Sequence, residues 1–128
     1  MALDSEGLSL AVRRNAKVLR WLTAAWEEDI PVVTSAAILV EVVYPRIDRQ
    51  MLRWVMSKVT VEPVTVAVST LASSLLMDVG LHGHKYAIDA MLAATVLGRP
   101  GQVTLLTSDV DDMTKLLGSY PRVRIKAL

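Results

Sequence analysis

The sequence contains no cysteine and no phenylalanine. The absence of cysteine excludes a disulfide scaffold, a cysteine-ligated zinc or iron–sulfur site, and a thiol nucleophile. Aromatic residues make up only 5% of the chain, so the core must be built mainly from Leu, Val, Ala, Ile and Met.

An excess of one charge is also missing, because 14 Lys and Arg residues balance 13 Asp and Glu residues, for a formal net charge of +1. Overall basicity therefore gives no argument for nucleic-acid binding, which would need a local basic patch or bound metal ions. No uncharged run is long enough to span a bilayer, and no basic segment followed by an apolar one opens the sequence. We expect a cytoplasmic protein that does not insert into a membrane.

The 128 residues are 52% hydrophobic and 21% charged, which fits a single domain over residues 1–128. Short apolar segments alternate with longer segments of helical periodicity, a pattern typical of βαβ units. We therefore predict an α/β protein, a three-layer α/β/α fold with a central, mostly parallel sheet of four or five short strands. The predicted strands are a stub ending at Leu3 and residues 31–34, 59–62, 103–106 and 123–126; the predicted helices are residues 7–15, 16–28, 36–43, 49–58, 65–78 and 86–97, and one ending at Leu117.

Acidic residues stand where predicted strands end. Asp4 directly follows the first strand, and Asp109 comes shortly after the strand that ends at Leu106, with Asp112 one helical turn later. The carboxyl ends of parallel strands meet at one edge of the sheet, where open α/β sheets bind their ligands. We expect Asp4 and Asp109 to meet at that edge.

Two further acids lie among apolar residues of predicted helices, Glu41 two turns into one helix and Asp89 in the first turn of another. A carboxylate buried there without a partner would cost several kcal/mol. Each acid therefore needs a basic or backbone partner, or the acids share a divalent cation. Oxygen ligands without cysteine favour Mg²⁺ or Mn²⁺, and such ions can activate a water for phosphodiester cleavage and stabilise the leaving oxygen.

Each acid also has a simpler interpretation. Asp109 can cap the helix that follows it, and Asp111 and Asp112 can favour the positive end of that helix. Glu41 and Asp89 can lie at an exposed edge or form separate ion pairs. The sequence alone leaves both interpretations open.

Four segments in order resemble the motifs of the PIN domain family, in its branch of VapC-like bacterial toxins. These segments are Leu3-Asp4-Ser5, residues 34–42, residues 88–94 and residues 106–112, and together they extend over nearly the whole chain. The resemblance implies a metal-dependent endoribonuclease. The implied catalytic and metal-binding acids are Asp4, Glu41, Asp89 and Asp109, with Asp112 as a further metal ligand, and the implied supporting residues are Ser5 and Thr107.

The resemblance also implies partners and a reaction. The protein would be the toxin of a type II toxin–antitoxin pair, a homodimer silenced by a small VapB-like antitoxin. It would use Mg²⁺, or Mn²⁺, to activate a water that cleaves RNA, with tRNA or ribosomal RNA as the substrate, leaving 5′-phosphate and 3′-hydroxyl ends.

Basic residues at helical spacing are candidates for RNA contacts. Arg13, Lys17 and Arg20 predict one basic helix face, and Arg46, Arg49 and Arg53 predict another. Lys85, beside the start of the helix that carries Asp89, is a further phosphate candidate. The alternative for each face is solvation, with the aliphatic stems covering apolar surface. The roles of Glu6, His82, His84 and Trp54 stay open between the site or an interface and ordinary packing or solvation.

Two other functions compete with the nuclease. A non-catalytic PIN-like module would keep the fold and bind nucleic acid or protein without turnover. A receiver-like phosphoacceptor would need a Lys near the end of a late strand, whereas Thr107-Ser108-Asp109 follows Leu106. A nuclease that acts on DNA or in RNA maturation would share the same acidic site.

Overall fold

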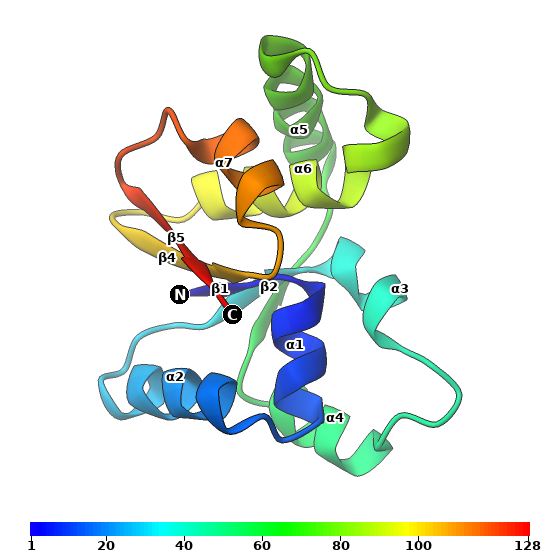
Figure 1. Ribbon diagram of the computed structural model, residues 1–128, viewed down its shortest axis with the longest axis vertical. Helices are drawn as coiled ribbons and strands as arrows, with labels where there is room; N and C mark the ends of the chain where they lie inside the picture. Colours follow the sequence, from blue (N-terminus) through cyan, green and yellow to red (C-terminus); the bar gives the residue numbers. More distant parts are fainter.

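The computed structural model describes residues 1–128 and has a five-stranded parallel sheet at its centre (Figure 1). The strands lie in the order β3-β2-β1-β4-β5, and every neighbouring pair is parallel. Their bounds are β1 (Ala2–Leu3), β2 (Val33–Ser35), β3 (Thr60–Glu62), β4 (Val103–Thr107) and β5 (Val123–Ala127). The predicted fold class is confirmed.

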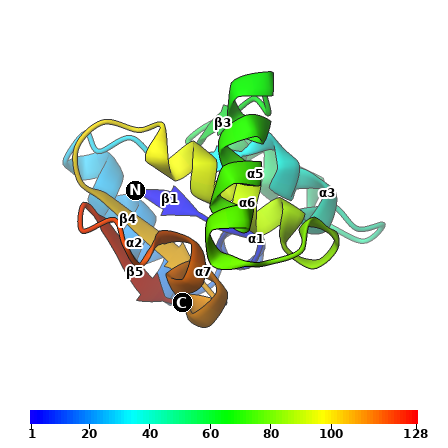
Figure 2. The ribbon, with the colours of Figure 1, turned by 90° about the horizontal axis from the view of Figure 1, so that it is seen from above.

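Helices cover both faces of the sheet. Figure 1 shows α1, α2 and α4 below the sheet and α5, α6 and α7 above it, while Figure 2 shows α5 lying across α6. The helices are α1 (Ser5–Val12), α2 (Ala16–Glu27), α3 (Leu39–Val42), α4 (Arg49–Met56), α5 (Val66–Val79), α6 (Gly83–Leu97) and α7 (Val110–Leu117), with a 3-10 turn, η1 (Ala36–Ile38), before α3. No single helix is long and apolar enough to cross a membrane, and α5 and α6 reach that length only as a pair bent by 120°.

Alternate residues of the short central strands face the two helical layers. Leu3 and Leu106 pack with α1, α2 and α4, whereas Ala2 and Leu105 pack with α5, α6 and α7. All four side chains are fully buried. Because helices cover both faces of this parallel sheet, the sequences of these strands are mostly apolar at every position.

Polar side chains begin several helices as their sequence context predicts. Asp48 caps α4 by accepting from the N–H of Met51 at 2.9 Å. Gly80 ends α5 with a φ of 68°, a left-handed conformation that costs glycine little. The start predicted for α6 is wrong, because the helix begins at Gly83 rather than at Tyr86. Asp89 therefore lies in the second turn of α6, one turn later than expected.

The predicted basic face on residues 13–20 is also wrong. Arg13 follows the last residue of α1, and Arg14 takes a φ of 61°. This left-handed conformation changes the direction of the chain between α1 and α2. Lys17 and Arg20 lie on α2, so the three residues do not share one helix. The helical spacing across this break arises by coincidence.

The second predicted basic face loses one member for a similar reason. Arg46 lies in the connection before α4, because Asp48 caps the helix and Arg49 is its first residue. Arg49 and Arg53 remain one turn apart on α4. The predicted helix over residues 36–43 is instead the 3-10 turn η1 followed by the single turn α3.

The guanidinium of Arg122 closes the carboxyl end of α6 and the turn after it. It donates to the carbonyls of Leu97, Arg99 and Gly101. We expect Arg122→Met to lower the free energy of unfolding by about 2–3 kcal/mol, since charge-assisted hydrogen bonds to partly buried carbonyls are lost. Urea denaturation measures this loss. A change no larger than that of Arg124→Met, an exposed neighbour on β5, would contradict the assignment.

Candidate metal centre

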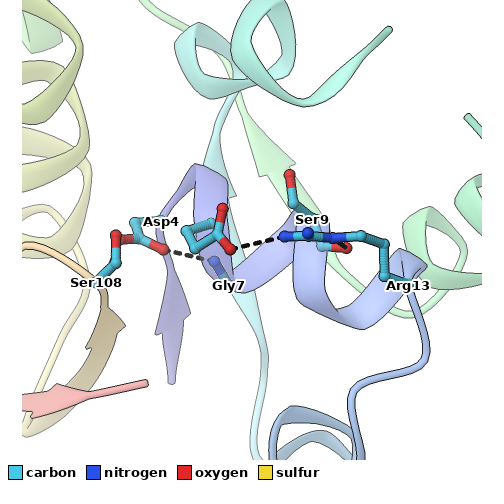
Figure 3. A network of polar contacts seen from close by, with 6 residues as sticks. Asp4, Gly7, Ser9, Arg13 and Ser108 are labelled. Carbon is cyan, nitrogen blue, oxygen red and sulfur yellow. Dashed lines mark hydrogen bonds and ion pairs between the residues drawn. The ribbon is translucent and has the colours of Figure 1, made fainter.

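Asp4 is buried at the carboxyl end of β1, where it links two segments of the chain. Its Oδ1 accepts from the N–H of Gly7 at 2.6 Å and so caps α1, while its Oδ2 accepts from the N–H of Ser108 at 2.9 Å (Figure 3). The Ser108 hydroxyl lies a further 3.5 Å from the same Oδ2. The carboxylate of Asp4 is therefore held rigidly between the start of α1 and the end of β4.

The turn from β4 into α7 is fixed by its own side chains. Thr107 is buried, and its Oγ1 accepts from the N–H of Asp109 at 2.9 Å. Asp109 caps α7, since its Oδ1 accepts from the N–H of Asp112 at 3.3 Å. The capping interpretation of Asp109 is correct, and its second carboxylate oxygen remains free for another partner.

Three carboxylates from two helices form the closest acidic group. Asp89 on α6, the cap residue Asp109, and Asp112 in the first turn of α7 each bring one oxygen to within 4.8 Å of the others. Asp89 and Asp112 are partly buried and Asp109 is exposed. Asp4 and Glu41 lie outside this closest group.

The charges of the other four predicted acids all act on Asp89. Burial and the charges of four other acids together raise the pKa of Asp89 to about 6; burial contributes most, followed by Asp109, Asp112, Glu41 and Asp4 in that order. Glu41 follows the interpretation of an exposed edge, because η1 and the single turn of α3 place its side chain in solvent. Its charge nevertheless contributes to the negative potential at Asp89.

Sequence reasoning missed one residue of this site, Lys115. Its Nζ lies 2.9 Å from Oδ1 of Asp112, and this hydrogen bond is the main reason why the pKa of Asp112 is lowered. Lys85 also lowers the pKa of Asp112 through its charge. The spacing of three residues between Asp112 and Lys115 on one helix was the available signal.

The other predicted residues lie in different settings. Ser5 is the first residue of α1. Arg13 pairs with Glu6 through Nη2 and Oε1 at 2.7 Å, and Lys17 donates to the carbonyl of Ala127 at 3.4 Å. These contacts surround the carboxyl edge of the sheet without entering the acidic group. Exposed positions are taken by Arg20, Arg46, Arg49, Lys85, His82 and His84.

No protein-family model matches the sequence, and no curated protein matches it either. Solved structures do match in three dimensions. One is a chain of the VapBC2 complex from Rickettsia felis bound to a DNA fragment from its promoter, with a TM-score of 0.73, 14% identity, and coverage of 99% of this chain and 97% of that one. Another belongs to a toxin–antitoxin complex from Klebsiella pneumoniae, with a TM-score of 0.64, 20% identity, and coverage of 95% and 93%. The chain has a PIN-like fold.

The donor set of this PIN-like chain fits a hard divalent cation. All the groups are carboxylate oxygens, and the raised pKa of Asp89 shows that negative charge there is only partly compensated. Opposite ligands of a cation with bonds of about 2.1 Å are about 4.2 Å apart. The spread of 4.8 Å therefore needs only a small closure or one bridging water.

The metal-free PIN-like chain should lose stability as the pH rises. The folded state raises the pKa of Asp89 from 3.8 to about 6, so it binds the proton more tightly than the unfolded chain does. The stabilising contribution is complete below the unfolded value and is lost as the pH rises through the folded one. Asp89→Asn should gain about 1 kcal/mol over wild type between about pH 4 and about pH 7.5, since water screens this partly exposed group.

Urea denaturation in buffer with a chelator measures this difference at each pH. Saturating Mg²⁺ should then abolish the advantage of Asp89→Asn at neutral pH by stabilising the wild type alone. A difference between the two proteins that stays constant across the pH range would contradict the electrostatic account.

Proposed function

We propose that this PIN-like chain is a Mg²⁺- or Mn²⁺-dependent endoribonuclease of the VapC type, the toxin of a type II toxin–antitoxin pair in the cytoplasm. One observation carries the proposal: acids from three other segments of the chain act on Asp89, and their charges, together with burial, raise its pKa to about 6. Such an arrangement is unfavourable for the empty protein and becomes favourable when a divalent cation is bound.

Asp89, Asp109 and Asp112 would hold the ion, with Asp4 and Glu41 completing the site directly or through water. When bound, a divalent ion supplies a Lewis acid for a phosphate oxygen and lowers the pKa of a water that attacks phosphorus. The side chains of this chain would position the ion and the water. Asp4 is fixed by Gly7 and Ser108, and Asp109 by its capping bond, so neither reorganises when the substrate binds.

The RNA substrate needs cations near a negative site. Among the candidates, Lys85 is best placed, because its charge acts on Asp112. Arg13 is paired with Glu6 and Lys17 with a carbonyl, so both contribute less. The remaining candidates, Arg20, Arg46 and Arg49, would contact phosphates farther along the chain of the RNA.

The antitoxin partner and a second copy need apolar surface on this chain. Val40, Val43, Tyr44 and Trp54 are exposed large side chains on or near α3 and α4. Beside them lies a hollow of about 510 Å³ lined by Val43, Tyr44, Pro45, Ile47, Arg49, Leu52 and Arg53. An apolar floor with arginines at its rim suits an antitoxin segment that carries apolar and acidic residues. The similar chains from Rickettsia felis and Klebsiella pneumoniae belong to a VapBC2 complex and a toxin–antitoxin complex, which supports such a partner.

Incubation of the purified chain with total RNA tests the function. We expect cleavage with Mg²⁺ or Mn²⁺, 5′-phosphate and 3′-hydroxyl ends, and complete inhibition by EDTA that added Mn²⁺ reverses. RNA that is bound but never cut would indicate the non-catalytic module instead, and cleavage insensitive to EDTA would contradict the metal centre.

A further inference from the structure

Two lysines meet at one aromatic ring beside the acidic group. The Nζ of Lys85 lies 5.1 Å from the ring centroid of Tyr86, and the Nζ of Lys115 lies 5.8 Å from the same centroid. Tyr86 is only 8% exposed, so its ring is a fixed support for both ammonium groups. Lys85 comes from α6 and Lys115 from α7, which places the pair across the junction of these helices.

Lys115 differs from Lys85 because it also bonds a carboxylate of the acidic group. Its ammonium lies 2.9 Å from Asp112, whereas the ammonium of Lys85 makes no hydrogen bond or ion pair. The side chain of Lys115 is 50% exposed and that of Asp112 only 15%. The lysine is therefore the mobile member of the pair, and the carboxylate is the fixed one.

A divalent cation at Asp112 and the ammonium of Lys115 compete for the same carboxylate. The two positive charges repel each other at such a distance, and an exposed lysine moves at little cost. The ammonium already lies 5.8 Å from the centroid of the Tyr86 ring, so it keeps this favourable contact when it leaves Asp112.

We propose that Lys115 is an exchangeable counter-ion, which neutralises Asp112 in the metal-free protein. When a divalent cation binds, its ammonium leaves Asp112, stays at the Tyr86 ring and forms a two-lysine phosphate clamp with Lys85. The phosphate-binding half of this inference rests on the proposed function, because its ligand is the RNA backbone beside the cleaved bond. The counter-ion half concerns metal binding alone. In this account the cation first neutralises the carboxylates of the site. The two lysines are then free to bind the RNA backbone, which is itself negatively charged.

Calorimetric titration of Mn²⁺ in the absence of RNA tests the counter-ion. Lys115→Met should bind Mn²⁺ about fivefold more tightly than wild type, since the competing ammonium is gone. Lys85→Met is the matched control, because it removes the same charge from the same ring without an ion pair to Asp112, and it should gain less than about twofold. Equal gains in the two variants, or no gain in Lys115→Met, would overturn the proposal.

The movement itself has a spectroscopic signature. In protein labelled with ¹⁵N-lysine, the ammonium signal of Lys115, assigned with Lys115→Met, should shift when Mg²⁺ saturates the site. The signal of Lys126, an exposed lysine on β5, should stay unchanged. A Lys115 signal that does not respond to saturating Mg²⁺ would show that the ion pair with Asp112 persists, which overturns the exchange.

The clamp predicts opposite effects on metal and RNA. Lys115→Met and Lys85→Met should each raise KM for RNA about threefold and reduce the salt dependence of RNA binding by about one counterion, with kcat little changed. An unchanged KM for RNA in both variants would contradict the proposed two-lysine phosphate clamp. If the protein cleaves no RNA at all, the proposed function fails while the Mn²⁺ titration still decides the counter-ion exchange.

Discussion

Asp89→Asn should lower the rate of RNA cleavage at least about 100-fold, although it stabilises the metal-free protein at neutral pH. The two effects have one cause. The carboxylate of Asp89 is partly buried and faces four other acids, so its charge is unfavourable until a cation binds. The amide keeps the shape and removes the charge, which relieves the empty protein and removes a ligand from the centre.

Single-turnover cleavage of a fixed RNA, measured with Mg²⁺, gives the activity, and urea denaturation with a chelator gives the stability. Asp78→Asn is the matched control, because Asp78 is an exposed acid on α5 that contributes nothing to the charge around Asp89. It should leave both quantities unchanged. An Asp89→Asn protein that cleaves RNA as fast as wild type would show that the acidic edge is not the active site.

Asp4→Ala should lose both activity and stability, which separates Asp4 from Asp89. Its carboxylate accepts from the N–H groups of Gly7 and Ser108, so its removal leaves a helix end uncapped and a partly buried donor unpaired. We expect a loss of about 3 kcal/mol in the free energy of unfolding together with at least about 100-fold in cleavage rate.

Asp48→Ala provides the matched control for this loss. Asp48 caps α4 through the N–H of Met51, as Asp4 caps α1, but it lies away from the acidic group. Its replacement should lower the free energy of unfolding by less than Asp4→Ala does and leave cleavage intact. Loss of cleavage in Asp48→Ala to the same degree would show that the effect of Asp4 is only structural.

The fold was predictable from the sequence because its determinants are local and periodic. The apolar run at residues 103–106 has no polar face, and only a strand covered on both sides accommodates that pattern. The meeting of Asp4 with the Asp109 region followed from the same reasoning, since β1 and β4 are neighbours and both acids follow their strands.

The errors arose where tertiary contacts override spacing. Arg13 and Lys17 have helical spacing in the sequence, but the left-handed Arg14 separates them, and no composition pattern reveals a positive φ at an arginine. Lys115 was missed because an ion pair on one helix is common on solvated surfaces. The ion pair between Lys115 and Asp112 is relevant to the site only because Asp112 lies beside Asp89, which the sequence does not reveal.

Asp109 shows why the simple interpretation and the functional one are compatible. Its Oδ1 caps α7, and the same carboxylate contributes an oxygen to the acidic group with Asp89 and Asp112. A sequence pattern of Thr-Ser-Asp before a helix predicts the cap, while the position after a central strand predicts the site. In this fold the cap is the means by which the carboxylate is positioned.

Anomalous scattering from crystals soaked in Mn²⁺ tests the central claim most directly. The account predicts a strong peak among the carboxylates of Asp89, Asp109 and Asp112, with Lys115 displaced from Asp112. A map with no peak at these carboxylates, or with Mn²⁺ bound only elsewhere on the surface, would contradict a metal centre at this edge of the sheet.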